Sequence, residues 1–162
     1  MAVDTYLKID TVDGESKAKG FEKNIEVLAW SWGASQTGSF QKGTGGGGAG
    51  KVNVNDLSIT KYIDSSSTVL LSSLCKGAHF KDAKLVCRKA GGDSPVDFLE
   101  IKLDNVIVTG LSTGGSQGEE LVTENVTLNF EKFEVKYRTQ DEKGKKGGEK
   151  IAKWNISKNA ES

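Results

Sequence analysis

Apolar and polar residues alternate with a period of two over most of the chain, which is the pattern of β-strands that bury one face. The alternating stretches are separated by segments rich in Gly, Ser, Asp and Lys, which are typical of turns and loops. Strands are therefore predicted over residues 3–9, 24–32, 52–62, 83–89, 96–111, 124–138 and 150–156. The pattern indicates an all-β fold.

The predicted strand over residues 24–32 is apolar on both of its faces. One face ends in the small residues Ala29 and Ser31. The other carries Leu28, Trp30 and Trp32, of which the two tryptophans are large enough to anchor a core. Such a strand is either sandwiched between layers, or has one face on the core and the other on a partner or a lumen.

The alternation changes phase within the predicted strand over residues 124–138. The first half places Val126, Leu128 and Phe130 on one face, and the second half continues in the opposite phase with Phe133, Val135 and Tyr137. An extra residue around Glu131 and Lys132 is the sequence pattern of a β-bulge or a barrel corner. A closed or strongly curved sheet is therefore predicted.

One segment, between Asp64 and Gly77, has a helical period instead. Asp64 or one of the serines at 65–67 can cap the helix, and Gly77 is placed to end it. Its apolar stripe consists of Leu70, Leu71, Leu74, Cys75 and Ala78. The short length and narrow stripe predict a helix on the outside of the barrel, covering one opening or edge.

The Gly-rich segment over residues 36–51 contains the GxxxxGK core of a phosphate-binding loop, formed by Gly45, Gly50 and Lys51. Val52 stands where that motif needs a Ser or Thr hydroxyl, and a predicted strand follows where it needs a helix. An extended surface loop is the better interpretation. The polar, Gly-rich segment over residues 139–149 is likewise predicted to be a surface loop.

The whole chain of 162 residues is predicted to be a single domain. Its 22 basic and 22 acidic residues balance, so the chain has no global charge with which to attract nucleic acid or an anionic membrane. Near-zero net charge also lowers the electrostatic cost of self-association. The N-terminus has no signal-peptide pattern, and no apolar run is long enough for a membrane span.

The residue patterns that suggest catalysis or metal binding do not hold together. Gly114 to Gly118 match GxSxG, but the histidine of the chain, His79, precedes Ser116 and a strand follows the motif. Cys75, His79 and Cys87 do not have an established zinc spacing, and packing explains both cysteines, which are expected to be reduced. No enzyme activity, metal or cofactor is therefore predicted.

Several stretches, taken together, resemble one known family. They are "MAVDTYLKI", "LAWSWGASQTGS", "GGGGAGKVNVNDLSITKYID", "CRKAGG", "STGGSQGEELVTENVTLNF" and "WNI", in this order from Met1 to about Asn159. They resemble the haemolysin-coregulated protein (Hcp) family, the inner-tube subunit of the bacterial type VI secretion system. The departures lie at residues 20–23, 40–44 and 139–149, in predicted loops or loop edges, so they bear on partner choice more than on fold.

The resemblance implies a β-barrel of two sheets with a helix at its side, similar to phage tail tubes, assembling as a hexameric ring. Rings would stack into a hollow tube, capped by a spike protein of the valine-glycine-repeat family and surrounded by a contractile sheath. The tube would be assembled in the cytoplasm and expelled by contraction, with small effector proteins in its lumen. Such export needs no signal peptide.

A ring requires one patch to meet a different patch on the next copy, and a barrel offers this through its edge strands and side helix. Stacking needs a projecting segment, for which the loop over residues 36–51 is the candidate, answered by residues 113–119. The predicted contact residues are Gln36, Lys42, Gly45, Gly48, Gly50, Lys51, Thr113, Gln117 and Glu119. Ser31 is predicted to face the lumen. The alternative is a monomeric β-barrel that binds a small ligand or sugar.

Overall fold

The structure is a computed structural model that describes residues 2–38, 50–89, 95–140 and 146–162. Its elements follow the chain in the order β1 (Val3–Ile9), β2 (Ile25–Val27), β3 (Ala29–Ser31), β4 (Ala34–Ser35), β5 (Asn53–Val54), β6 (Leu57–Tyr62), α1 (Ser66–Lys76), β7 (His79–Lys89), β8 (Val96–Gly114), β9 (Thr123–Gln140) and β10 (Lys146–Asn155). The predicted β fold with one helix is confirmed. β9 and β10 also extend into the segment predicted as a loop over residues 139–149.

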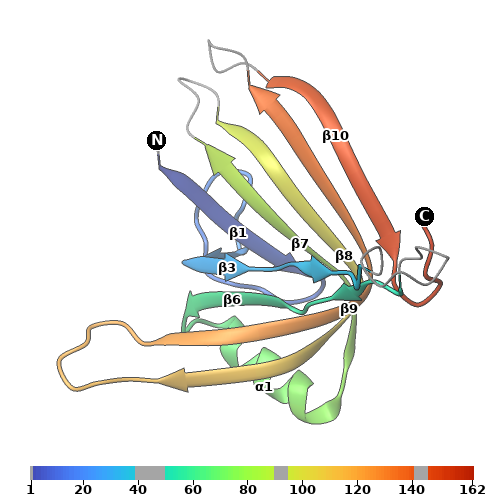
Figure 1. Ribbon diagram of the computed structural model, residues 1–162. Helices are drawn as coiled ribbons and strands as arrows, with labels where there is room; N and C mark the ends of the chain where they lie inside the picture. The colour runs from blue at the N-terminus through green and yellow to red at the C-terminus, as the bar shows by residue number, and fades with distance from the viewer. Residues whose placement is uncertain (1, 39–49, 90–94, 141–145) are drawn as a thin grey trace, which may run out of the picture.

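The main sheet curls almost into a closed barrel. Within the described residues it has eight strands, in the order β2-β1-β7-β8-β9-β6-β3 with β10 beside β9, while β4 and β5 form a separate small sheet. β2 and β3 stand at the two ends of this order, yet only Leu28 separates them along the chain. The Leu28 N–H donates to the Thr60 carbonyl of β6 at 2.8 Å. The order of strands therefore returns to its start (Figure 1).

The long strands β8 and β9 divide the barrel into two halves. The first part of β9 pairs with β6, from Tyr62↔Thr123 to Leu57↔Leu128. The second part of β9 pairs with β10, from Asn155↔Lys132 onwards. Figure 1 shows both long strands bending between these parts, so that β6 belongs to one half and β10 to the other.

At this bend, the alternation of inward-facing and outward-facing side chains shifts by one residue on both long strands. On β9, Phe130 and Phe133 both pack against the core, with ring centroids 6.4 Å apart. On β8, Leu103 and Val106 are both fully buried, and Asn105 between them has a φ of 53°, in the left-handed region. The predicted barrel corner is confirmed.

The prediction that an extra residue is inserted at the corner is wrong. The register of β8 and β9 runs unbroken from Asp104↔Lys132 to Val106↔Phe130. The two strands turn over together at this point, so the apolar side stays inward without an inserted residue. A register shift does occur on this pair, but farther along, between Val108 and Gly110.

The predicted strand over residues 24–32 is two strands, β2 and β3, and the buried face of the chain changes at Leu28 between them. Ile25 and Val27 are buried, whereas Leu28 is 47% exposed. Trp30 and Trp32 pack against the core as predicted, but Leu28 does not share their face. The cause is the change of partner, because the chain leaves β1 and joins β6 at this residue.

Helix α1 begins and ends where the sequence predicts. Asp64 Oδ1 accepts a hydrogen bond from the Ser66 N–H at 2.8 Å, and Gly77 ends the helix with a φ of 63°. The buried positions are Ser66, Leu70 and Ser73, spaced at i, i+4 and i+7.

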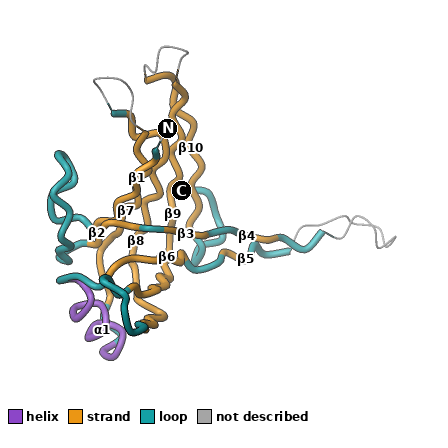
Figure 2. Tube along the Cα trace, turned by 90° about the vertical axis from the view of Figure 1, so that its left-hand side faces the viewer, coloured by secondary structure: helices purple, strands orange, loops and turns teal. Residues whose placement is uncertain are grey.

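The predicted apolar stripe of α1 is partly wrong. Leu71 and Cys75 are exposed, because each lies one residue, about 100°, beyond a position that faces the barrel. The helix packs on the outside, against β8 (Figure 2).

Candidate functional site

The side chains considered for catalysis or metal binding are separated in the structure. Cys87 is buried in the barrel core, where burial raises the pKa of its thiol, and Cys75 is exposed on α1. His79 Nδ1 lies 3.1 Å from Asn105 Oδ1 at the barrel corner. Among the described residues, no group of three or more His, Cys, Asp or Glu is placed to hold a metal ion. In the same residues no helix has the length and apolarity needed to cross a bilayer.

The root of the Gly-rich segment is a two-stranded ribbon, formed by β4 and β5, that projects from the barrel (Figure 2). Trp32 fixes this root, since its Nε1–H donates to the Asn55 carbonyl at 2.9 Å and its ring packs edge-on against Phe133 at 5.0 Å. Three predicted contact residues, Gln36, Gly50 and Lys51, are exposed at the ribbon. The other three, Lys42, Gly45 and Gly48, lie outside the described residues.

A groove of about 480 Å³ lies beside the ribbon root. Val52, Phe133 and Trp154 supply its apolar and aromatic lining, and Gln36 and Gly50 stand at its ribbon side. The groove therefore separates the ribbon from the edge strand β10, which carries Trp154.

The second predicted contact segment is the tip of the β8–β9 hairpin. Thr113, Gln117 and Glu119 are all exposed there. The Thr113 hydroxyl donates to the Thr123 carbonyl at 3.1 Å, and Glu119 Oε2 accepts from the Ser116 N–H at 3.3 Å. The hairpin extends to the left in Figure 1, whereas the ribbon extends to the right in Figure 2, so the two segments leave the barrel in different directions. Within one protomer they do not meet.

Ser31, the residue predicted to face a lumen, is exposed at the end of β3 and lies opposite Ser58 of β6. Ala29, on the same strand, is exposed as well. The two small side chains thus share an open strand surface, while Trp30 between them packs against the core.

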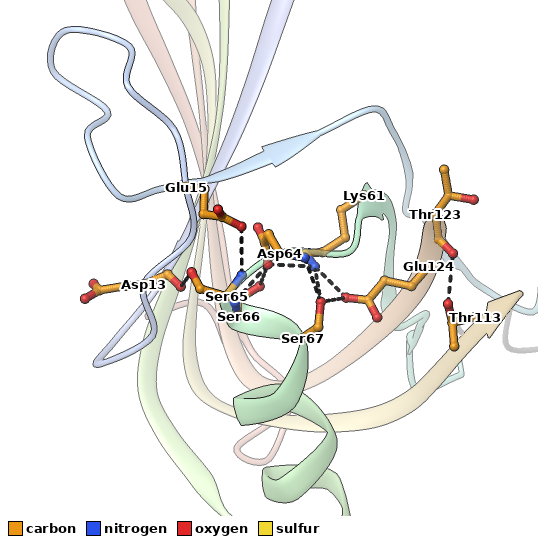
Figure 3. A network of polar contacts seen from close by, with 10 residues as sticks. All are labelled: Asp13, Glu15, Lys61, Asp64, Ser65, Ser66, Ser67, Thr113, Thr123 and Glu124. Atoms are coloured by element: carbon orange, nitrogen blue, oxygen red, sulfur yellow. Dashed lines mark hydrogen bonds and ion pairs between the residues drawn. The ribbon is translucent and has the colours of Figure 1, made fainter. Parts of the chain in front are cut away.

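A buried ion network, which the sequence analysis missed, joins the hairpin to the helix (Figure 3). Lys61 Nζ on β6 lies 2.5 Å from Glu124 Oε1 on β9, 3.0 Å from Asp64 Oδ1 and 3.1 Å from Ser67 Oγ. The Ser67 hydroxyl also donates to Glu124 Oε1 at 2.6 Å. Lys61 and Glu124 are 0% and 2% exposed, so all their charge is compensated inside the protein.

The start of α1 is also bonded to the segment between β1 and β2. The Ser65 N–H donates to Glu15 Oε2 at 2.9 Å, and the Ser65 hydroxyl donates to the Asp13 carbonyl at 3.1 Å (Figure 3). The sequence indicated the burial of two members of the network, because Lys61 and Glu124 occupy inward-facing positions in the alternation of their predicted strands.

A second polar cluster ties the C-terminal segment to the barrel corner. Glu131 accepts hydrogen bonds from Asn105 Nδ2 at 3.0 Å and from the Ser157 hydroxyl at 2.8 Å. These two bonds lower the pKa of the Glu131 carboxyl. Ile156, beside Ser157, donates its N–H to the Glu131 carbonyl at 2.8 Å, so the segment after β10 is held at this point.

The sheet presents two unlike margins that no sequence pattern indicated. At one, β10 pairs with β9 alone among the described residues and exposes Ile151, which is 52% exposed. At the other, Val3 of β1 and Leu28, which follows β2, are exposed and line a hollow with Glu26. Ile63, which lines a second hollow with Glu26, is exposed as well, and its N–H donates to the Val122 carbonyl before β9. Figure 1 shows β10 and β1 on opposite sides of the upper part of the barrel. The protomer therefore has two different surfaces with apolar groups facing outward.

Comparisons with known proteins agree with this architecture. Residues 6–137 match the family described as "Type VI secretion system effector, Hcp". The chain is 53% identical to Protein hcp1 of Pseudomonas aeruginosa over 163 residues, which covers 100% of both chains. Among solved structures, a type six secretion system protein is 32% identical with a TM-score of 0.93, covering 99% of this chain and 100% of that one. Hcp1 from Salmonella typhimurium is 34% identical with a TM-score of 0.82, covering 100% of each chain.

The match to the family spans most of the chain, and the barrel, the side helix and the corner lie within the part that matches the solved structures. The chain belongs to the Hcp family of type VI secretion system proteins.

Proposed function

We propose that copies of this chain close into a hexameric ring, and that these rings stack into a hollow tube. As a member of the Hcp family, the protein is a secreted tube protein of the type VI secretion system and not an enzyme. The proposal concerns how this particular chain builds that tube and what the tube meets.

The two unlike margins of the sheet carry the ring proposal. A closed ring needs a heterologous contact, in which one patch meets a different patch on the next copy. β10 supplies an edge strand whose outer side is unpaired among the described residues, and such edges readily accept another chain. The opposite margin offers Val3, Leu28 and Ile63, which are 46%, 47% and 48% exposed. Burying both surfaces in every contact of a ring would remove these apolar groups from water.

The projecting ribbon and the hairpin tip support the stacking proposal. Gln36, Gly50 and Lys51 are exposed at the ribbon, and Thr113, Gln117 and Glu119 are exposed at the tip. Because these segments leave the protomer in different directions, each is available to another subunit of the tube. Lys42, Gly45 and Gly48 are included in the stacking proposal on the sequence alone.

Further partners belong to the same proposal. Ser31 and Ala29 form a small-residue strand surface suited to a wide channel, so we assign it to the lumen and to contact with small effector proteins. A spike protein of the valine-glycine-repeat family would cap the tube and a contractile sheath would surround it. Assembly would take place in the cytoplasm, with export by contraction.

Native mass spectrometry over a concentration series tests the ring. A discrete species of six copies is expected, with longer stacks at high concentration in electron micrographs. Substituting Gln36→Ala and Lys51→Ala together should shorten the stacks and leave the ring of six intact, with Lys81→Ala on β7 as the matched control. A chain that stays monomeric at every concentration would overturn the proposal, and would favour a ligand-binding barrel that uses the groove beside Trp154.

A further inference from the structure

The two margins of the sheet, at β10 and at β1 with Leu28, also differ in charge. On β10, Lys150 and Lys153 are exposed and form no ion pair within the described residues. The nearby acids are already engaged, since Glu149 pairs with Arg138 at 3.1 Å and Glu134 pairs with Lys136 at 3.4 Å. The surface formed by Lys150, Ile151 and Lys153, the basic margin, therefore has a local excess of positive charge.

The opposite surface is acidic. Asp4 and Glu26 line a hollow of about 350 Å³ together with Val3 and Leu28. Both acids are exposed, and neither makes an ion pair in the described part of the chain. We call the surface formed by Val3, Asp4, Glu26 and Leu28 the acidic margin.

Arg88, the cation opposite Asp4, is engaged with other groups. Arg88 lies opposite Asp4 in the register of β1 and β7, but its Nε donates to Asp97 at 2.8 Å and its guanidinium stacks over Phe21 at 4.2 Å. Burial, and then the charges of Asp4 and Glu26, raise the pKa of the Tyr6 hydroxyl in the same hollow.

The acidic character continues beyond the hollow. Glu26 also lines a second hollow, of about 180 Å³, together with Glu15 and Ile63. Asp64 lines it too, but its charge is paired with Lys61. Glu15 and Glu26 thus border the exposed side chain of Ile63, as Asp4 and Glu26 border Val3 and Leu28.

We infer that the basic margin of one copy docks on the acidic margin of the next, and that this charge pairing selects the unlike contact of the ring. The inference rests on the proposed ring and adds what specifies it. Opposite potentials across an interface favour the correct partner and raise its rate of encounter, while like charges placed together cost several kcal/mol. Each margin also carries exposed apolar groups, so the docked surface has apolar area to bury besides its ion pairs.

The same charges disfavour the symmetric alternative. An exposed edge strand such as β10 can pair with the same edge of a second copy and give a closed dimer. That pairing would bring the lysines of both copies together, and Lys150 and Lys153, being three residues apart, point to opposite faces of the strand. Both faces of a β10–β10 pair would thus carry like charges, which destabilises it. The acidic margin, in contrast, neutralises the charges of Lys150 and Lys153.

Two charge-reversal variants test the inference. The first is Asp4→Lys with Glu26→Lys, which leaves a chain with two basic margins. The second is Lys150→Glu with Lys153→Glu, which leaves a chain with two acidic margins. Alone, each should assemble about tenfold or more weakly than the unaltered protein. Mixed in equal amounts, they should form rings in which the two variants alternate, three copies of each, as read by native mass spectrometry.

Two controls separate charge pairing from damage to the fold. Lys81→Glu reverses an exposed charge on β7, which lies between β1 and β8 and is not an edge strand, and should leave assembly unchanged. Lys150→Gln with Lys153→Gln removes the charge without reversing it, and should weaken assembly less than the reversal does. Ring formation of the unaltered protein should also weaken as salt rises from about 0.1 M to 1 M, where the screening length falls from about 10 Å to 3 Å.

The outcomes distinguish this inference from the ring itself. If the unaltered protein forms rings and either reversed variant assembles equally well alone, the charge pairing is wrong and the ring stands. The same holds if both variants are folded by circular dichroism and their mixture does not assemble. If the unaltered protein forms no ring of any kind, the ring proposal fails first and this inference fails with it.

Discussion

The ammonium group of Lys61 lies 2.5 Å from the carboxylate of Glu124, and neither side chain is more than 2% exposed to solvent. The two residues face each other across β6 and β9 in register, next to the first turn of α1. A charge pair in this position joins three elements at the base of the hairpin (Figure 3).

Removing one member of this pair should be strongly destabilising. Lys61→Ala leaves Glu124 buried and without its cation, and an uncompensated buried charge costs about 3–5 kcal/mol of the free energy of unfolding. Urea unfolding followed by tryptophan fluorescence measures the change. Lys61→Met combined with Glu124→Leu should cost less than the single change, because no charge of the pair is stranded. Equal losses for both would contradict a role for the pairing.

Stability should depend on pH through Glu131. Its carboxyl has a pKa below the ordinary value of 4.5, because Asn105 and then Ser157 donate hydrogen bonds to it. A carboxyl with a lowered folded-state pKa adds stability above the unfolded-state pKa, and that stability disappears as the pH falls through the folded-state pKa. The thermal midpoint of the native protein should therefore exceed that of Glu131→Gln at neutral pH, and the difference should shrink below about pH 4.5.

Ser157→Ala serves as the comparison for this pH dependence, since it removes one of the two donors and leaves the carboxyl in place. It should reduce the contribution without abolishing it. A difference between the native protein and Glu131→Gln that is the same at pH 3 and pH 7 would show that the carboxylate form makes no contribution.

The two thiols should differ in reactivity. Cys75 is exposed on α1, whereas Cys87 is buried with a raised thiol pKa, and the thiolate is the reactive form. Iodoacetamide labelling read by mass spectrometry should modify Cys75 in the native protein and both cysteines in denaturant. In Cys75→Ser, native protein should stay unlabelled over the same period. Rapid labelling of Cys87 in that variant would mean that the barrel opens readily.

A bulky side chain at position 31 should impair the holding of cargo and leave the ring folded. Ser31→Gln adds volume to a surface that we assign to the lumen, while Ser31→Ala keeps it small. Retention of an effector protein by purified rings, compared between the two variants, is the measurement. Normal retention by Ser31→Gln would refute the assignment.

The alternation of apolar and polar residues was sufficient to predict the strands, because most of them bury one face and solvent wets the other. It failed at Leu28, where the face that is buried depends on which strand the chain pairs with. It located the corner but predicted an inserted residue there. The register is in fact unbroken, because β8 and β9 turn together, and the sequence of one strand does not show what its partner does. Strand pairing joins residues that are far apart in the sequence, so the local pattern of apolar and polar residues predicts it only indirectly.

The surfaces proposed for assembly were predictable only in part, for the same reason. Glycines identify a segment that projects, so the ribbon at Gln36 was foreseen as exposed. The margins at Lys150 and Glu26 were not, because a margin exists only once the order of strands is known. Lys61 was overlooked although its phase pointed inward, since an isolated lysine gives no sign of the carboxylate that compensates it.

The corner at Asn105 has a mechanical consequence. Because β8 and β9 pass through it without a break in register, the covalent backbone runs from the hairpin tip to the far end of the barrel with no loop in between. Force applied at the tip of a subunit is then carried along two adjacent strands, across many hydrogen bonds at once. We therefore expect the barrel to resist pulling along this hairpin better than pulling on α1, which is attached to the barrel by side-chain contacts and not by a ladder of backbone hydrogen bonds. In the proposed function, where a contracting sheath would drive the tube forward, subunits that are stiff in this direction would transmit the force without unfolding.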